Sequence, residues 1–208
     1  IAFTFLQVIG SFALSILMLP LLLLPRRVGL PQICALYGGY ISLIERHVLG
    51  LRLEWRGLEH LPQDTSSFII AAKHQSAYET LKIPFSRMMR YPVIVLKKEL
   101  IYLPGWGLYP PRMGLIAIDR STGPKALQQM IDGAKRGFEE GRPLALFPEG
   151  TRKSPGAAPD YKSGLAKIYR DLQVPVVPMA LNTGVFWGRN KFFKDGGTVV
   201  FEFLPPLP

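Results

Sequence analysis

The sequence predicts an α/β fold in which a mostly parallel central sheet is flanked by helices and preceded by an apolar N-terminal element. Short apolar runs suited to buried strands recur after residue 50, and segments of helical periodicity separate them. Strands that are buried on both faces and separated by helices are typical of parallel sheets. The 208 residues suffice for one such domain with a small appendage. We therefore expect two parts, residues 1–50 and residues 51–208.

Six apolar runs are the expected strands of the sheet. They are residues 67–72, 92–96, 114–118, 143–147, 174–181 and 198–204. The clearest helix is predicted over 124–140, where apolar residues repeat at helical spacing. Pro124 lies near its start and Gly141 just past its end, which is the usual asymmetry of helix termini. Residues 182–197 are expected to form a long loop with exposed aromatic and basic side chains.

The N-terminal segment differs from the rest of the chain because residues 1–24 contain no charged side chain. As a helix this segment would be roughly 36 Å long at ~1.5 Å per residue, and a bilayer's hydrocarbon core is ~30 Å thick. Arg26 and Arg27 follow directly, which is typical of a segment whose C-terminal end faces the cytoplasm. We therefore expect attachment to the inner, cytoplasmic membrane, with the remaining chain on the cytoplasmic side.

A second and milder apolar stretch covers residues 30–50. Prolines interrupt the path between the two stretches, at Pro20, Pro25 and Pro31. Two arrangements remain open at this point. The first stretch spans the bilayer, or the two stretches form a helical hairpin that lies in one leaflet.

Charge and composition narrow the classes of partner. The chain has 25 Lys and Arg against 15 Asp and Glu, a net charge of +10, which suits nucleic acid, anionic lipid or phosphorylated ligands. No nucleic-acid-binding motif is present and an uncharged N-terminal stretch would not serve one, so no nucleic-acid partner is expected. The single Cys34 excludes a disulfide framework and a cysteine-based zinc site. The three histidines are not spaced as ligand pairs, so no metal site is predicted.

A histidine and a carboxylate follow the expected strand 67–72. His74 comes directly after it, and Glu79 lies five residues further on. A carboxylate can accept a hydrogen bond from one ring nitrogen and leave the other nitrogen free to take a proton. This pair alone does not distinguish a catalytic site from an unrelated surface pair.

Three further strand ends carry basic or small polar residues. Lys97 follows the expected strand 92–96 and Arg120 comes shortly after 114–118, while residues 149–152 follow the strand at 143–147. In that last block, Gly150 permits close backbone approach, Thr151 offers a hydroxyl and Arg152 can bind a phosphate through two bonds. Because the carboxyl ends of parallel strands meet at one edge of a sheet, we expect these residues to surround one site.

Taken together in their order, these blocks resemble those of the glycerolipid acyltransferases, in particular the 1-acylglycerol-3-phosphate (lysophosphatidic acid) acyltransferases. The matching blocks are His74-x-x-x-x-Glu79, Ile118-Asp119-Arg120, Phe147-Pro148-Glu149-Gly150-Thr151-Arg152 and Val177-Pro178-Met179-Ala180-Leu181-Asn182. The resemblance covers roughly residues 52–205, and the Phe-Pro-Glu-Gly-Thr-Arg block is its most specific part. The apolar N-terminal pair is similar to the two-helix membrane element of bacterial members.

The resemblance implies a reaction and roles for these residues. His74 would be the general base that deprotonates the sn-2 hydroxyl of a lysophosphatidate, and Glu79 would orient its ring. The hydroxyl would attack an acyl thioester, acyl-CoA or an acylated acyl carrier protein, with no other cofactor, giving phosphatidic acid for phospholipid biosynthesis. The acceptor phosphate would be bound by the basic and small residues of the other blocks: Lys97, Arg120, Glu149, Gly150, Thr151 and Arg152.

Two positions depart from the family pattern. Glu79 stands where Asp is usual, and Lys73 stands where Asn is commoner before the histidine. A histidine paired with Glu at this spacing also occurs in lipid A secondary acyltransferases. An acyltransferase acting on another lipid acceptor, glycerol 3-phosphate or a lipid A precursor, therefore remains the alternative. A serine hydrolase is disfavoured, because the chain has no Gly-x-Ser-x-Gly motif and Ser76 lies very close in sequence to His74.

Overall fold

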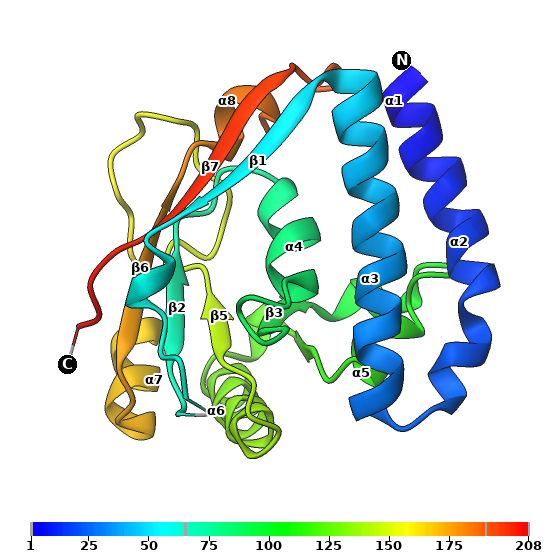
Figure 1. Cartoon of the computed structure of the whole chain (residues 1–208). Coiled ribbons are helices and arrows are strands. Elements are labelled where there is room, and N and C mark those ends of the chain that lie inside the picture. Colours follow the sequence, from blue (N-terminus) through cyan, green and yellow to red (C-terminus); the bar gives the residue numbers. More distant parts are fainter. Residues whose placement is uncertain (1, 65, 190, 208) are drawn as a thin grey trace.

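A computed structural model describes residues 2–64, 66–189 and 191–207, and these contain a seven-stranded sheet (Figure 1). The strands are β1 (Leu51–Arg56), β2 (Ile69–Ala72), β3 (Val93–Lys97), β4 (Ile116–Ile118), β5 (Leu144–Leu146), β6 (Val176–Leu181) and β7 (Gly197–Phe203). Their order across the sheet is β1-β7-β6-β2-β5-β3-β4. Every neighbouring pair is parallel except β6 with β7, so the predicted mostly parallel α/β fold is confirmed.

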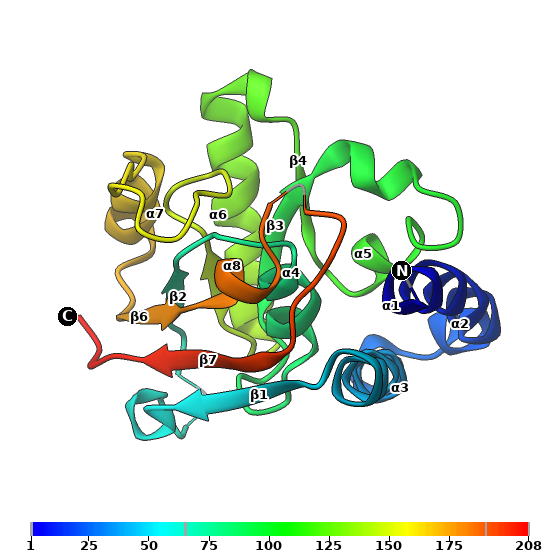
Figure 2. The same ribbon diagram turned by 90° about the horizontal axis from the view of Figure 1, so that it is seen from above.

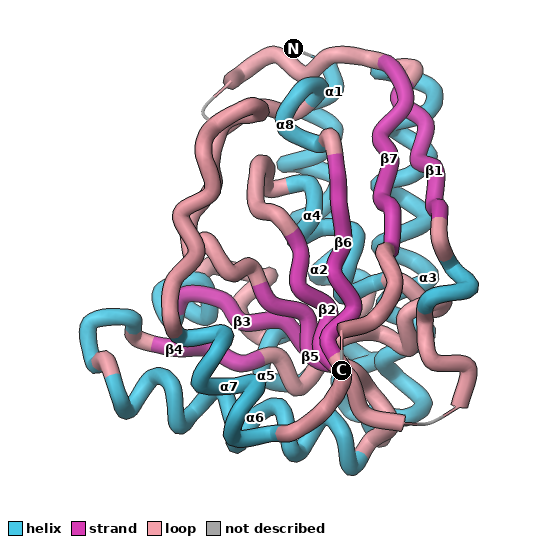
Figure 3. The backbone as a smooth tube through the Cα atoms, turned by 90° about the vertical axis from the view of Figure 1, so that its left-hand side faces the viewer, coloured by secondary structure: helices cyan, strands magenta, loops and turns pink. Residues whose placement is uncertain are grey.

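Strand β1 is absent from the six expected strands. It pairs in parallel with β7 at one side of the sheet, and Figure 3 shows the two strands running together there. Its sequence, LRLEWR, alternates apolar and charged residues, and its burial alternates accordingly along most of its length. Continuous apolar runs are typical of strands buried on both faces, and a half-exposed edge strand lacks that signal.

The helices cover both faces of the sheet. They are α1 (Ala2–Phe5), α2 (Ser11–Leu17), α3 (Arg26–Ile44), α4 (Tyr78–Lys82), α5 (Tyr109–Arg112), α6 (Pro124–Glu139), α7 (Gly164–Leu172) and α8 (Thr183–Phe186). Figure 2 shows α6 and α7 on one side of the sheet and α3, α4 and α5 on the other. The consecutive residues Ile69 and Ile70 of β2 are both fully buried, and each belongs to a different apolar cluster. Alternation along the strand therefore supplies one side chain to each layer.

The N-terminal stretches form two helical segments that lie side by side (Figure 1). The first comprises α1, a π-helical turn over Leu6–Gly10 and α2, and it passes into a 3₁₀ turn that contains Pro20. The second is α3, which continues as a π-helical turn over Glu45–Leu49. Among the described residues, no helix combines the length and the apolar character needed to cross a membrane.

The apolar core extends across residue 50, the boundary between the two expected parts. Ile41 of α3 is fully buried and belongs to the same cluster as Phe201 of β7. Trp187 is also in this cluster, where it contacts Phe3 edge-on with 5.3 Å between ring centroids. The expectation of a long exposed loop over 182–197 is therefore wrong around α8 and Trp187. The sequence around Trp187 gives no sign that the N-terminal helix covers this side chain.

Candidate active site

The predicted site residues lie along the carboxyl ends of neighbouring strands. His74 follows β2, the 149–152 block follows β5, Lys97 ends β3 and Arg120 follows β4. These four strands are consecutive in the order β2-β5-β3-β4 and mutually parallel. The topology therefore brings the segments to one edge of the sheet, as parallel α/β folds do with ligand sites.

His74 and Glu79 face one another at this edge. Nδ1 of His74 lies 3.9 Å from Oε1 of Glu79; the histidine side chain is 13% exposed and the glutamate side chain is fully buried. The imidazole stacks on Phe147, with 4.2 Å between ring centroids. The 3.9 Å separation is longer than a hydrogen bond. It is a distance from which a small side-chain rotation would form one, and catalytic hydrogen bonds commonly tighten on substrate binding.

Glu79 is held by three hydrogen-bond donors on one oxygen. Its Oε1 accepts from the backbone N–H groups of Gln75 (2.6 Å) and Ser76 (2.9 Å) and from the hydroxyl of Thr183 (2.8 Å). Its Oε2 and the Nδ1 of His74 have no partner within the part of the chain that the structure describes. Oε1, the oxygen that lies 3.9 Å from Nδ1, is thus fixed in position by three donors, while Oε2 and Nδ1 keep unused hydrogen-bonding capacity.

Glu149 holds the other side of the segment that carries His74. Its buried carboxylate accepts from Lys73 Nζ (3.1 Å) and from the backbone N–H of His74 (3.3 Å). The backbone N–H of Lys153 donates to the carbonyl of His74 (2.8 Å). The block after β5 therefore fixes the backbone of the histidine on both sides. Whether Glu149 also meets a substrate phosphate stays a prediction.

The predicted basic residues form an exposed rim around His74, Glu79 and Glu149. Arg120 donates from Nη1 to the carbonyl of Gly150, which has a left-handed backbone with φ of 62°. Lys97 and Thr151 are exposed, and neither side chain has a hydrogen bond or ion pair among the described residues. Arg152 is half-buried. Cationic side chains with few internal partners are well suited to bind an anion.

Lys98 behaves differently from its neighbour Lys97. It pairs with Asp119 at 2.5 Å, and this hydrogen bond holds the pKa of the Asp119 carboxyl well below its usual range. The positive charge of Lys98 is therefore partly compensated within the protein. Lys97 is the cation of the two that remains free for a ligand.

A buried ion pair connects α4, the helix that carries Glu79, to the N-terminal helices. Lys82 Nζ lies 2.5 Å from Oε2 of Glu45, and the hydroxyl of Tyr78 donates to the same oxygen at 3.4 Å. Burial raises the pKa of Glu45 and lowers that of Lys82. Breaking such a pair by removing one partner typically costs about 3–5 kcal/mol. The position of α4 therefore depends on the N-terminal helices.

The sequence did not indicate two side chains that contact His74 and Glu79. Thr183 lies one residue beyond the fourth motif and is fully buried against Glu79. Phe147 lies within the third motif, but its stacking on His74 has no sequence signal. Both contacts join segments that are distant in the sequence, so only the fold reveals them.

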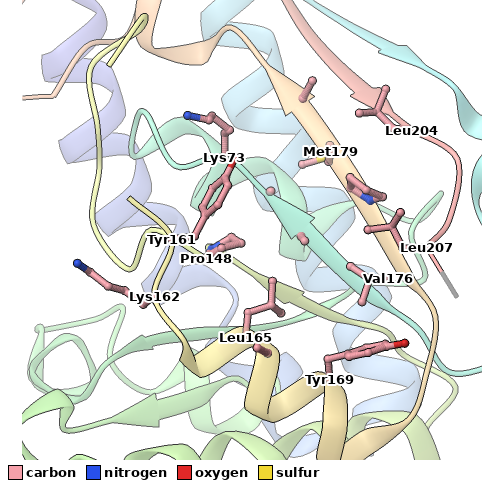
Figure 4. A pocket seen from close by; sticks show the side chains of 15 residues that line it. Lys73, Pro148, Tyr161, Lys162, Leu165, Tyr169, Val176, Met179, Leu204 and Leu207 are labelled. Carbon is pink, nitrogen blue, oxygen red and sulfur yellow. The ribbon is translucent and has the colours of Figure 1, made fainter. Parts of the chain in front are cut away.

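An apolar groove of about 620 Å³ opens beside this edge (Figure 4). It borders Lys73 and Pro148, which are next in sequence to His74 and Glu149. The rest of its wall comes from β6, α7 and the C-terminal segment, including Leu165, Val176 and Leu207. Figure 4 shows Lys73 and Lys162 on one side of the groove and Val176, Leu204 and Leu207 on the other.

Residues 52–182, more than half of the chain, match the family model described as Acyltransferase. The chain therefore belongs to the acyltransferase family. It is 33% identical over 169 residues to a 1-acyl-sn-glycerol-3-phosphate acyltransferase of Pseudomonas aeruginosa, covering 79% of this chain and 62% of the relative. It is 28% identical over 165 residues to the human 1-acyl-sn-glycerol-3-phosphate acyltransferase alpha, covering 78% of this chain and 57% of the relative. The chain thus spans less than two thirds of the length of these relatives.

The fold is also that of a solved structure. The crystal structure of the 1-acyl-sn-glycerophosphate (LPA) acyltransferase PlsC from Thermotoga maritima superposes with a TM-score of 0.75 at 21% identity. The match covers 99% of this chain and 82% of that one. The likeness therefore includes the N-terminal helices as well as the sheet.

Proposed function

We propose that this protein transfers an acyl chain from acyl-CoA or an acylated acyl carrier protein to the sn-2 hydroxyl of 1-acylglycerol 3-phosphate, giving phosphatidic acid. Membership of the acyltransferase family and the names of its relatives support this reaction. The observation that carries the proposal is the placement of His74, which faces a buried carboxylate at a sheet edge rimmed by cations. Acyl transfer to a phosphorylated lipid needs both features at one site.

In this proposal the imidazole of His74 acts as the general base. Its Nε2 takes the proton of the sn-2 hydroxyl as the oxygen attacks the thioester carbonyl. The carbon–sulfur bond then breaks, and the proton passes from Nε2 to the leaving thiolate. Glu79 accepts a hydrogen bond from Nδ1, which selects the useful tautomer and stabilises the imidazolium. Positioned proton transfer typically contributes ~10²–10⁴-fold in rate, and proximity of the two substrates adds to it.

The rim supplies the binding site for the acceptor phosphate. Arg152, Arg120 and Lys97 provide charge, and Thr151 provides a hydroxyl, while the backbone at Gly150 lets the phosphate approach closely. Glu149 contributes by holding this block against the histidine segment. The cation excess of the rim matches the negative charge of a phosphate monoester.

We also propose that the N-terminal helices lie in one leaflet of the inner membrane, with the site facing the cytoplasm. Their outward apolar side chains are at least half exposed: Phe5, Val8, Ile9, Phe12, Ile16 and Leu17. A contiguous exposed apolar surface of this kind indicates contact with a membrane or a protein. Flotation with phospholipid vesicles tests it: Phe12→Ser/Ile16→Ser should float poorly, and Leu204→Ser/Leu207→Ser should float as the native chain does. Equal flotation of both would contradict the membrane contact.

The apolar groove beside Lys73 suits an acyl chain, because most of the residues that line it are apolar and because it borders the residue next to His74. Leu165→Trp would fill part of this groove. The variant should shift the preferred acyl donor toward shorter chains, measured as kcat/KM over a series of acyl-CoA lengths. Arg170→Trp on the same helix, which does not line the groove, is the matched control. An unchanged chain-length preference in Leu165→Trp would show that the acyl chain does not bind in this groove.

An acceptor assay tests the reaction itself. Purified protein is supplied with labelled acyl-CoA or acylated carrier protein and, in separate reactions, lysophosphatidate, glycerol 3-phosphate or a lipid A precursor. We expect labelled phosphatidic acid from lysophosphatidate as the main product. Preferential labelling of either other acceptor would show that the protein is an acyltransferase but that lysophosphatidate is not its main acceptor.

A further inference from the structure

A pocket of about 840 Å³ lies at the opposite end of the strands from His74. Arg90 and Tyr91 line it just before β3 begins, and Arg142 lines it just before β5 begins. Because β3 and β5 run parallel to β2, their starts lie at the edge opposite the one that carries His74. The start of α3, including Arg26 and Arg27, forms another wall of the pocket. This pocket is therefore separate from the candidate active site.

The pocket concentrates positive charge. Its walls include five arginines and a single carboxylate, that of Glu140; the arginines are Arg26, Arg27, Arg87, Arg90 and Arg142. Glu140 already pairs with Arg26 and with Arg142, the latter at 3.1 Å. Positive charges that lie close together in one pocket repel each other unless an anion compensates them. Four positive charges therefore remain in excess of the single negative one.

Two of these arginines, Arg142 and Arg90, are held in place by carbonyl groups. Arg142 is 6% exposed and donates to the carbonyls of Tyr91 and Met113, both at 2.8 Å. Arg90 donates to the carbonyl of Ser66 at 2.8 Å. The carbonyls orient the guanidinium groups but add no full negative charge to that of Glu140. Burial lowers the pKa of both groups, as expected where charge is removed from water.

Two of the pocket-lining arginines also carry a donor for which the described residues offer no acceptor. Nη2 of Arg142 and Nη1 of Arg90 are buried without a hydrogen-bond partner among the described residues. Unsatisfied buried donors are uncommon in proteins and call for an explanation such as a missing ligand or ion. Arg27 and Arg87 also line the pocket; both are exposed, and their side chains make no hydrogen bond or ion pair with the described chain. Arginine is the side chain best suited to oxygen anions with several acceptor atoms.

We propose that this arginine pocket binds a phosphate group, as a second anion site distinct from the acceptor site beside His74. The inference does not depend on the proposed acyl transfer. The phosphate comes from a lipid headgroup or from a small soluble phosphate, and both have the same chemistry. A headgroup is favoured by two exposed apolar side chains that flank the pocket's α3 wall, Leu23 and Val28, which are 83% and 43% exposed. Acyl chains of a phosphate-bearing lipid would lie against such residues.

The test uses the full purified chain and its variant Arg27→Gln/Arg87→Gln. Both side chains are exposed and unbonded, so the substitutions should preserve the fold, which circular dichroism and thermal unfolding verify. The matched control is Arg136→Gln/Arg170→Gln, which removes two exposed arginines from α6 and α7. All three proteins are also prepared with Arg152→Ala, so that binding at the candidate active site does not obscure the result.

Titration calorimetry with inorganic phosphate measures the site directly. We expect Arg27→Gln/Arg87→Gln to raise the Kd for phosphate about tenfold or more, because each lost charge-assisted bond is worth at least that factor. The control should bind as the native chain does. An unchanged Kd in Arg27→Gln/Arg87→Gln, or an equal rise in the control, would overturn the proposal.

Vesicle flotation then distinguishes the two sources of phosphate. Phosphatidylcholine vesicles are compared with and without phosphatidic acid. If Arg27→Gln/Arg87→Gln alone loses the phosphatidic-acid-dependent increase in binding, the ligand is a lipid headgroup. If it keeps that increase while its Kd for inorganic phosphate rises, the site serves a soluble phosphate. Both results require the pocket, and the calorimetric result decides whether it is a site at all.

Discussion

The candidate active site has an inner and an outer part that are built in opposite ways. The inner part consists of His74, Glu79, Glu149 and Thr183, and its carboxylates are fully buried and bonded to backbone and side-chain donors. The outer part consists of Lys97, Arg120, Thr151 and Arg152, which are exposed or half-buried and have few internal partners. The first is held rigidly, and the second is open to solvent.

This difference indicates a division of labour. Proton transfer requires a base whose tautomer and direction are fixed before the substrate arrives, and buried hydrogen bonds provide that. Binding of a phosphate requires donors that are not already occupied, and exposed cations provide those. We therefore expect substitutions in the inner part to lower kcat and substitutions in the outer part to raise KM for the phosphorylated acceptor.

Among the residues that support His74 or form the outer part, the largest effect is expected from Glu79→Gln. The amide nitrogen would donate a hydrogen bond to Nδ1 of His74 and so favour the tautomer that carries its proton on Nε2. In that tautomer Nε2 cannot accept the proton of the substrate hydroxyl. We expect kcat to decrease by about 10²-fold with KM little changed. Glu79→Asp, which keeps the carboxylate, should retain much more activity. Equal losses in both variants would show that the length of the side chain matters as much as its charge.

Arg152→Ala tests the outer part. Loss of a charge-assisted bond to phosphate should raise KM for lysophosphatidate by about tenfold and leave kcat nearly unchanged. Steady-state kinetics with the acyl donor at saturation measure this, and Arg170→Ala on α7 is the control. A higher KM for the acyl donor with an unchanged KM for lysophosphatidate would place the phosphate elsewhere.

Thr183→Val tests how far the inner part depends on its supporting bonds. The substitution keeps the side-chain shape and removes one of three donors to Glu79. We expect it to destabilise the fold by about 2 kcal/mol, since the bond goes to a charged group. Kinetics should show a decrease in kcat of only a few-fold. Urea unfolding measures the first effect, and an unchanged free energy of unfolding would mean that water replaces the hydroxyl.

The smallest effect is expected from Lys97→Ala. This exposed side chain has no internal partner, so its loss should leave folding unchanged and raise KM for lysophosphatidate about twofold. The neighbouring Lys98→Ala is the comparison, because its charge is already paired with Asp119. A larger rise in KM for Lys98→Ala than for Lys97→Ala would reverse the assignment of these two cations.

The sequence predicts those parts of the site that follow from the order of strands and motifs along the chain. Buried strands appear as apolar runs, and the residues after them lie at one sheet edge because parallel topology requires it. The half-exposed strand β1, by contrast, lacks an apolar run. The contacts of Thr183 with Glu79 and of Trp187 with Phe3 join residues more than 100 positions apart. Such pairings follow from the packing of distant segments, which local patterns do not encode.

Acyl transfer by His74→Ala tests the central claim most directly. The variant and the native chain are compared with labelled acyl donor and lysophosphatidate, after thermal unfolding has shown that both are equally folded. We predict that the native chain produces labelled phosphatidic acid and that the variant loses at least about 10²-fold in kcat. Near-native turnover by a folded His74→Ala protein would contradict the assignment of this histidine as the base.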